Sequence, residues 1–429
     1  MSEMTLLPVF VVFILYFSSI PIAFALFASA LAYFTFINAG SPVDLLLQKF
    51  ISSTSSFPLL AVPFFIMAGE IMNYSGISSS LMKMAEVLTG HLRGGLAQVN
   101  VMLAVLMGGI SGSANADAAM QAKILVPEME KHGMSKGFSS ALTAAASAVC
   151  PVIPPGINLI IYALIANVSV AKIFIAGYVP GVLMAACLMV TVAIIAKKRG
   201  YKPTRDKRAS LREMMVQARH SSWALLLPLA IIMGLRYGVF TPTEAGAIAV
   251  VFCTFVGFFV YKKLKWKHFP HIIRDTVYAT SSVVLLLVSA SVFSYYMSWE
   301  RLPQQITEVL MDLSSNVYVM LMVINILLLV LGMFLEGGAV LIITAPLLVP
   351  VMLKMGVDPI HFGMIMIVNI MIGGVTPPFG SMMFTTCAIT KLPVAEFVKE
   401  SIPFILALIV SLIVVTYWPS LIMVLPNLL

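Results

Sequence analysis

The chain carries PVIPPG at residues 151–156 and GGVTPPFG at residues 373–380, and these two stretches decide its fold. Each lies inside a long apolar run, at 137–167 and at 360–388. Proline has no backbone N–H, and its ring clashes with the carbonyl one turn back. A double proline therefore breaks a helix and leaves several carbonyl groups without an intrahelical partner. We expect two membrane helices that are interrupted near the middle.

The two stretches belong to an internal repeat, because a shift of 223 residues places Pro154-Pro155 on Pro377-Pro378. Proline is 24 of 429 residues, so a chance match occurs for about 6% of the prolines tested. Four prolines that match at one shift therefore indicate a repeat. An odd number of predicted crossings separates the two copies, so they should have inverted topology. The other matches are Pro127 with Pro350, Pro180 with Pro403, Gly109 with Gly332, Gly133 with Gly356 and Phe174 with Phe397.

The composition is that of a membrane protein, with 60% hydrophobic and only 10% charged residues. Soluble chains are about half apolar and about a quarter charged. This excludes a disordered chain, a disulfide scaffold and almost any soluble enzyme, and it predicts an all-α polytopic protein with about ten spans plus two hairpins. The apolar runs are 4–18, 20–37, 58–74, 96–131, 137–167, 171–196, 222–240, 243–261, 276–297, 317–354, 360–388 and 402–424.

Two of these runs predict re-entrant helical hairpins. The run 96–131 carries GGISGSAN at 108–115, and each flank is too short to cross a hydrocarbon core of about 30 Å. The run 317–354 is broken at LEGG (335–338). Amphipathic segments at 42–57 and 303–314 should lie along the interface as arms.

The basic residues indicate the orientation of the chain. Thirteen of the 26 Lys and Arg lie in 197–212 and 262–274, so the loops 197–221 and 262–275 should be cytoplasmic. Counting outward places both termini in the periplasm. Such clustering in short loops argues against nucleic-acid binding. The start lacks a basic region and a cleavage site, so we expect a retained first span. The four cysteines, at 150, 187, 253 and 387, fit neither a zinc site nor a disulfide framework.

Inverted repeats, hairpins and broken helices together predict a secondary transporter with its site near the bilayer midplane. We divide the chain into five parts. Residues 1–95 form scaffold spans with an arm, and residues 96–196 form a transport part with hairpin 96–131 and broken helix 137–167. Residues 197–275 form the cytoplasmic basic loops and connecting scaffold spans, 276–316 form a second scaffold span with an arm, and 317–429 form a transport part with hairpin 317–354 and broken helix 360–388.

The chain resembles a known family along nearly its whole length. The segments SGSANADAAM (111–120), VIPPGINLIIYA (152–163), GVFTPTEAGAIAV (238–250), LGMFLE (331–336) and VTPPFG (375–380) are similar to the large membrane subunit of tripartite ATP-independent periplasmic (TRAP) transporters. The family often has Ser where this chain has Gly156 and Asp where it has Glu336.

The resemblance implies an elevator-type, Na⁺-coupled importer of organic acids in the bacterial inner membrane. It also implies two partners, a small four-helix membrane subunit and a soluble periplasmic substrate-binding protein. Family members carry C4-dicarboxylates, sialic acids and other carboxylates, and the overall resemblance leans to sialic acid. No organic cofactor is expected.

We expect oxygen atoms and N–H groups at the hairpin tips and helix breaks to bind Na⁺ and substrate. The candidates for Na⁺ are Ser111, Gly112, Ser113, Asn115, Val152, Pro154, Glu336, Gly337, Gly338, Thr376, Pro377 and Gly380. The candidates for substrate are Ser113, Asn115, Asp117, Pro155, Gly156, Arg301, Glu336, Pro378 and Thr385.

Several charged residues leave alternatives open. Asp117 serves either loop amides at a helix start or Na⁺, and Glu336 is a candidate for an ion or substrate role. Glu244 follows Thr241 and Pro242 and fits an ordinary helix start, while Glu70 has no assignment. Arg301 forms either a solvated pair with Glu300 or an anchor for a substrate carboxylate.

Three other functions compete with Na⁺-coupled transport. Proton coupling would use a titratable relay, yet no His lies at the predicted depth. An intramembrane enzyme is disfavoured because GISGS (109–113) has no His near it and no H-E-x-x-H is present. A channel would need a continuous pore lining, usually from symmetric subunits.

Overall fold

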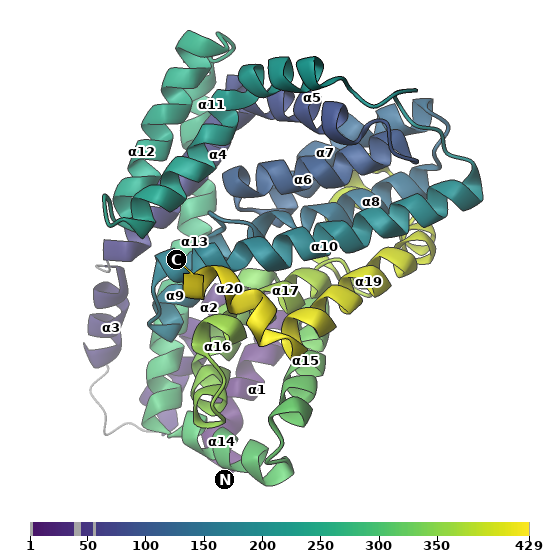
Figure 1. Cartoon of the computed structure of the whole chain (residues 1–429). Coiled ribbons are helices and arrows are strands. Elements are labelled where there is room, and N and C mark those ends of the chain that lie inside the picture. Colours follow the sequence, from purple (N-terminus) through teal and green to yellow (C-terminus); the bar gives the residue numbers. More distant parts are fainter. Residues whose placement is uncertain (1–2, 38–43, 55–56, 429) are drawn as a thin grey trace.

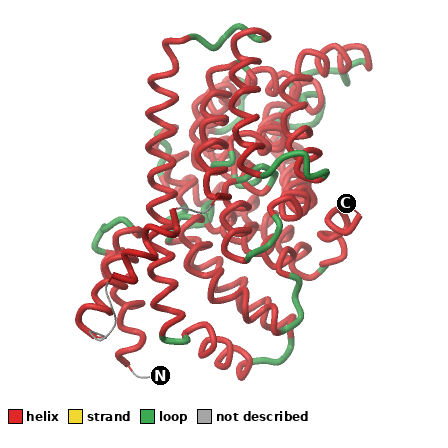
Figure 2. Tube along the Cα trace, turned by 90° about the vertical axis from the view of Figure 1, so that its left-hand side faces the viewer, coloured by secondary structure: helices red, strands yellow, loops and turns green. Residues whose placement is uncertain are grey.

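The computed structural model describes residues 3–37, 44–54 and 57–428, and the regular structure in these ranges is entirely helical. Figure 2 shows helices joined by short connections. Seven of the described helices are long and apolar enough to cross a membrane, or eight if the bent pair Lys136–Val152 and Ile157–Ala166 is one span. This is fewer than the ten predicted, because several apolar runs are divided into helices of 10–17 residues.

The helices fall into two groups, and we call the first group the frame. It contains the longest helix of the chain, Phe269–Trp299, which is about 46 Å long. Its members are α1 (Glu3–Phe17), α2 (Ile22–Ala32, continued by a π-helical turn at Tyr33–Ile37), α3 (Asp44–Thr54), α4 (Ala61–Ser75), α5 (Ile77–Thr89), α11 (Leu211–Arg236), α12 (Pro242–Phe255), α13 (Phe269–Trp299) and α14 (Leu302–Leu313).

The second group, which we call the hairpin bundle, contains both predicted hairpins and both broken helices. The helices α8 and α17 form its centre, since nearly all of their residues are buried. The members are α6 (Gly95–Ser111), α7 (Ala114–Lys131), α8 (Lys136–Ser147), α9 (Ile157–Ala166), α10 (Val170–Arg199), α15 (Val317–Phe334), α16 (Gly337–Lys354), α17 (Pro359–Gly373), α18 (Ser381–Thr390), α19 (Val394–Tyr417) and α20 (Pro419–Leu428).

The hairpin bundle is packed crosswise. The hairpin α6–α7 contacts α8 and also α18, which follows the second Pro-Pro break. The hairpin α15–α16 contacts α17 and also α9, which follows the first break. The helices α10 and α19 lie side by side, as Figure 1 shows. Each hairpin therefore contacts the helix that follows the break in the other half of the chain.

In the frame, too, helices from the first half of the chain pack against helices from the second half. The helix α4 packs against α12, and α2 packs against α13, which α3 also contacts. Figure 1 shows α11 and α12 together at the upper left and the N-terminus at the bottom of the view. The frame also contacts the bundle, because α4 meets α6 and α13 meets α16. Residues of both groups can thus form one site.

Helix ends often extend beyond the apolar runs, because capping groups determine them. Residues 222–236 of the run 222–240 lie in α11, which begins at Leu211 after a Ser210–Glu213 capping box. The run 402–424 is wrong as a single span, since α19 ends at Tyr417 and Pro419 starts a separate helix. The predicted helix start at Glu244 is confirmed, because the Thr241 backbone N–H donates to Glu244 Oε2 at 2.7 Å.

Both predicted arms are helical where the structure describes them. Residues 44–54 of the segment 42–57 form α3, whereas 42–43 and 55–56 lie outside the described residues. The segment 303–314 corresponds to α14. Sequence analysis did not distinguish the amphipathic α5, which connects α4 to the first hairpin.

Candidate functional site

The two hairpin tips meet at one cavity of about 150 Å³, which we call the tip cavity. Its walls come from both hairpins, from the starts of α9 and α18, from α17 and from the frame helix α13. The lining residues are Gly112, Ser113, Ala114, Asn115, Ile157, Asn158, Ile161, Ser282, Val283, Leu286, Glu336, Gly337, Gly338, Ile370, Met371, Gly374, Ser381 and Met382.

The first tip turns at Gly112, which has φ +61°, a conformation that favours glycine. A Cβ on Gly112 would lie 3.2 Å from the Pro155 carbonyl oxygen, so the tip packs tightly against the first break. Ser113 caps α7 by accepting a hydrogen bond from the Ala116 N–H at 3.4 Å. The amide oxygen Oδ1 of Asn115 is shielded and has no hydrogen-bond donor among the described residues. A cation or a ligand donor at the tip would supply the partner that this oxygen lacks.

The second tip presents a carboxylate to the cavity. Glu336 stands at the N-cap of α16, but its side chain makes no capping hydrogen bond and is exposed where the cavity opens. The preceding turn is fixed from the frame, because the Tyr16 hydroxyl donates to the Phe334 carbonyl oxygen at 2.8 Å. No Lys or Arg is among the described residues that line the tip cavity. A carboxylate ligand placed here would lie beside the negative charge of Glu336.

The helix breaks adjoin the cavity, and Gly374 of the second break lines it. The first break is fully buried over 151–156, and a Cβ on Gly156 would lie only 2.1 Å from the Pro151 carbonyl oxygen. In the second break the Thr376 hydroxyl donates to the Ile372 carbonyl oxygen at 2.7 Å. A Cβ on Gly380 would lie 2.7 Å from the Gly374 carbonyl oxygen. Both breaks thus fold tightly against their own carbonyl groups.

The structure brings together only some of the predicted site residues. Gly112, Ser113, Asn115, Glu336, Gly337 and Gly338 line the tip cavity. The side chain of Ser111 lies outside the described residues. The predicted residues that are not among those lining the cavity are Asp117, Val152, Pro154, Pro155, Gly156, Arg301, Thr376, Pro377, Pro378, Gly380 and Thr385.

Two of these residues have a clear place elsewhere. Asp117 is buried in the first turn of α7, beside the Cys150 thiol at the start of the first break. Arg301 is exposed at the start of α14, and 19 positions of chain separate it from Ser282 in the cavity wall. Its neighbour Glu300 accepts a hydrogen bond from the Tyr33 hydroxyl. Arg301 therefore does not reach the tip cavity.

Sequence analysis missed two polar residues of the cavity wall. Asn158 lies in the first turn of α9, where Gly338 approaches it, and a Cβ on Gly338 would be 3.8 Å from Asn158 Oδ1. An amide directly after a Pro-Pro break is a signal that could have indicated it. Ser282 lies on α13, far from either hairpin in the sequence. One serine in an apolar helix carries no such signal.

Comparison with known proteins identifies the family of this fold and site. Residues 9–421 match the model of the family described as the tripartite ATP-independent periplasmic transporter, DctM component. The chain belongs to this family. It is therefore a large-permease component and a multi-pass protein of the inner membrane.

Curated proteins match this chain over nearly its whole length, and a solved structure shares its fold. The sialic acid TRAP transporter large permease protein SiaM of Vibrio cholerae is 36% identical, over 96% of each chain. The C4-dicarboxylate large permease DctM of Pseudomonas aeruginosa is also 36% identical, over 88% of each chain. The crystal structure of the Alcanivorax borkumensis YdaH transporter has the same fold, with a TM-score of 0.65 and 14% identity, covering 88% of this chain and 89% of that one.

Proposed function

We propose that this large permease imports an organic acid across the inner membrane, with Na⁺ as the coupling ion. The observation that carries the proposal is the tip cavity, where Asn115 and Glu336 come from opposite hairpins. A site between two hairpin tips is typical of secondary transporters, and it argues against a continuous channel. No His lines the described cavity wall to serve a hydrolytic reaction.

Charge in the tip cavity supports coupling to a cation. An organic acid bound here would lie beside Glu336, and two carboxylates at short range repel each other unless a cation or a proton intervenes. Na⁺ prefers oxygen ligands, and the free Oδ1 of Asn115 and the carboxylate of Glu336 are of that kind. Na⁺ bound there would supply positive charge for the substrate carboxylate. Protonation of Glu336 is the alternative, and it would make transport proton-coupled.

Movement of the hairpin bundle along the frame, as in an elevator, would give alternating access. The crosswise contacts of hairpins with broken helices, and of α4–α12 with α2–α13, support two inverted repeats. With the loops 197–221 and 262–275 in the cytoplasm, the first hairpin enters from the cytoplasm and the second from the periplasm. Both termini are then periplasmic.

Two partners complete the proposed transporter, as the word tripartite in the family description suggests. One is a soluble periplasmic protein that binds the organic acid and delivers it. The other is a small four-helix membrane subunit, for which the exposed apolar faces of the frame offer contact area. The relatives are named for sialic acid and for C4-dicarboxylates, so both classes are candidate substrates, and we lean to sialic acid.

The test is uptake into proteoliposomes that contain the complete transporter, with radiolabelled N-acetylneuraminate and succinate in parallel. We expect uptake only with a Na⁺ gradient and the binding protein present. Uptake that is unchanged when K⁺ replaces Na⁺ would refute the coupling. Counterflow distinguishes the function classes, because a transporter exchanges its substrate whereas a channel conducts and an enzyme releases product.

Replacement of Glu336 distinguishes the two coupling ions. Glu336→Gln keeps the size of the side chain but removes its charge, so with Na⁺ coupling the Na⁺ concentration for half-maximal uptake should rise about tenfold or more. Glu308→Gln, which makes the same change at an exposed glutamate of α14 that does not line the cavity, is the matched control and should leave the Na⁺ dependence unchanged. If uptake by the parent protein follows a pH gradient and Glu336→Gln abolishes that dependence, the coupling ion is H⁺.

A further inference from the structure

A second cavity lies between the frame and the hairpin bundle, and its volume of about 600 Å³ exceeds that of the tip cavity. We call it the Lys49 cavity, because Lys49 of α3 is the only Lys, Arg, Asp or Glu among the described residues that line it. The other polar residues of its wall are Ser291, Ser294, Tyr295 and Ser298 of α13 and Ser52 and Ser53 of α3. No residue of this cavity belongs to the tip cavity.

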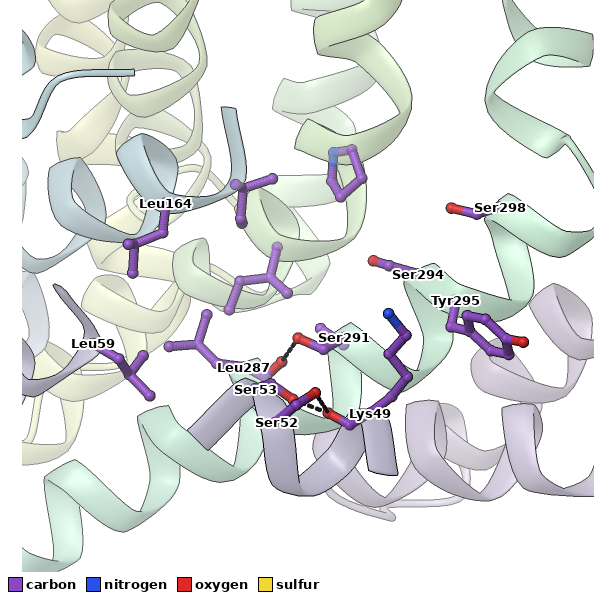
Figure 3. Close-up of a pocket in the computed structure, with 14 residues that line it drawn as sticks. Lys49, Ser52, Ser53, Leu59, Leu164, Leu287, Ser291, Ser294, Tyr295 and Ser298 are labelled. Carbon is purple, nitrogen blue, oxygen red and sulfur yellow. Dashed lines mark hydrogen bonds between the residues drawn. The ribbon is translucent and has the colours of Figure 1, made fainter. Parts of the chain in front are cut away.

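The Lys49 ammonium points into this cavity. Figure 3 shows the side chain rising from α3 toward Ser291 and Ser294. Its Nζ lies 5.7 Å from the centroid of the Tyr295 ring, a contact that holds the amine beside α13. In the part of the chain that the structure describes, no carboxylate lies within 4 Å of this amine. The positive charge is therefore available to an anion.

The two cavities lie along the same three helices. On α13 the lining passes from Ser282 in the tip cavity to Ser294 in the Lys49 cavity, about 18 Å along the helix. On α16 it passes from Gly337 to Pro346, about 14 Å, and on α9 it passes from Ile157 to Ile165, about 12 Å. The two linings adjoin on α13, where Leu286 belongs to the tip cavity and Leu287 to the Lys49 cavity. A slide of the bundle along α13 would therefore bring the hairpin tips opposite Lys49.

We propose that the Lys49 cavity is the frame half of the substrate site in the alternate state, where the Lys49 ammonium binds the substrate carboxylate. This inference rests on the proposed transport of an organic acid by movement of the bundle. In the present state the tips face Ser282 and have no basic partner, whereas in the alternate state they would face Lys49 and the three serines of α13 that line the Lys49 cavity. The substrate would then bind more tightly in the alternate state, because its carboxylate gains a cation there.

The charge of the cavity can be tested without any substrate. After replacement of the four native cysteines by Ala, a Cys at Ser294 is labelled in detergent with an anionic or a cationic methanethiosulfonate. We expect the ratio of the anionic to the cationic rate to fall roughly fivefold on Lys49→Gln, as one partly screened charge predicts. A Cys at the exposed Ser315 is the control, and its ratio should not change. An unchanged ratio at Ser294 would overturn the proposal.

Transport kinetics then test the role of the charge. With N-acetylneuraminate and succinate, Lys49→Gln should raise KM about tenfold with little change in kcat, and Lys49→Arg should restore most of the affinity. Lys172→Gln, an exposed lysine at the start of α10, is the matched control. If Lys49→Gln leaves KM unchanged while the parent protein transports, the inference fails and the proposed function stands. If the parent transports neither acid while the labelling ratio shifts as expected, the proposed function fails, and with it the assignment of this anion-attracting cavity to substrate.

A lipid phosphate has the same anionic chemistry as a substrate carboxylate. Labelling of the Cys at Ser294 is therefore repeated in nanodiscs with phosphatidylcholine alone and with added phosphatidylglycerol. Equal rates in both membranes support a soluble anion. A rate that falls severalfold with phosphatidylglycerol and recovers in Lys49→Gln would assign the cavity to lipid and overturn the proposal.

Discussion

Replacing Gly156 by Ala should disturb the first helix break and the ion dependence of transport together. The added Cβ would stand 2.1 Å from the Pro151 carbonyl oxygen and 2.9 Å from its carbon, although real Cβ contacts are essentially never under 3.0 Å. The φ of Gly156 is −85°, which any residue adopts, so the requirement for glycine is steric. The backbone segments at Pro151 and Gly156 must therefore move apart by about 1 Å. We expect this to lower the free energy of unfolding by about 1–3 kcal/mol.

The displacement should reach the tip cavity. Gly112 of the first tip packs against Pro155 and against the N–H of Ile157, which directly follows Gly156. We therefore expect a lower melting temperature in detergent and a smaller stabilisation by added Na⁺, because a tip that is displaced binds the ion less well. Uptake should require several times more Na⁺ than in the parent protein. Both effects come from one contact, so they should appear together.

The matched control is Gly338→Ala on the second tip. Its Cβ would have a nearest neighbour at 3.8 Å, which is ordinary van der Waals contact, so the melting temperature should not fall. Thermal unfolding of the two variants and the parent is measured with and without Na⁺, in the same detergent. The reasoning is refuted if Gly156→Ala melts like the parent and keeps the full Na⁺ response.

Two further substitutions test packing away from the cavity. Gly373→Ala places a Cβ 2.7 Å from the backbone of Gly332, so it should lower stability by about 1–3 kcal/mol, and equal melting of variant and parent would contradict the close approach of α15 and α17. Arg199→Met removes an ion pair of 2.8 Å with Glu400 between α10 and α19; because the arginine is 37% exposed, we expect a loss of at most about 1 kcal/mol that shrinks in high salt. Glu400→Gln should cost a similar amount, and the double variant little more, whereas fully additive losses would show that the pair does not interact.

The sequence by itself determined most of the helices, the two helical hairpins and the two breaks. These features depend on local chemistry, since proline interrupts a helix within one turn and glycine at 112 permits a left-handed turn whatever surrounds it. The residues that line the cavity from the hairpin tips, such as Ser113 and Glu336, were predictable for the same reason. Membership of the family also followed from motifs that are read along the chain.

Only the tertiary structure decided which distant residues share the site. Ser282 and Lys49 come from frame helices whose sequences predict only a membrane span and an interfacial helix. They line the two cavities because α13 packs against the bundle and α3 packs against α13. Arg301, which chemistry alone favours as a carboxylate anchor, is excluded from the tip cavity because it lies beyond the end of a 31-residue helix. The sequence shows which chemical group each side chain carries. The packing of helices that are hundreds of residues apart determines which groups come into contact.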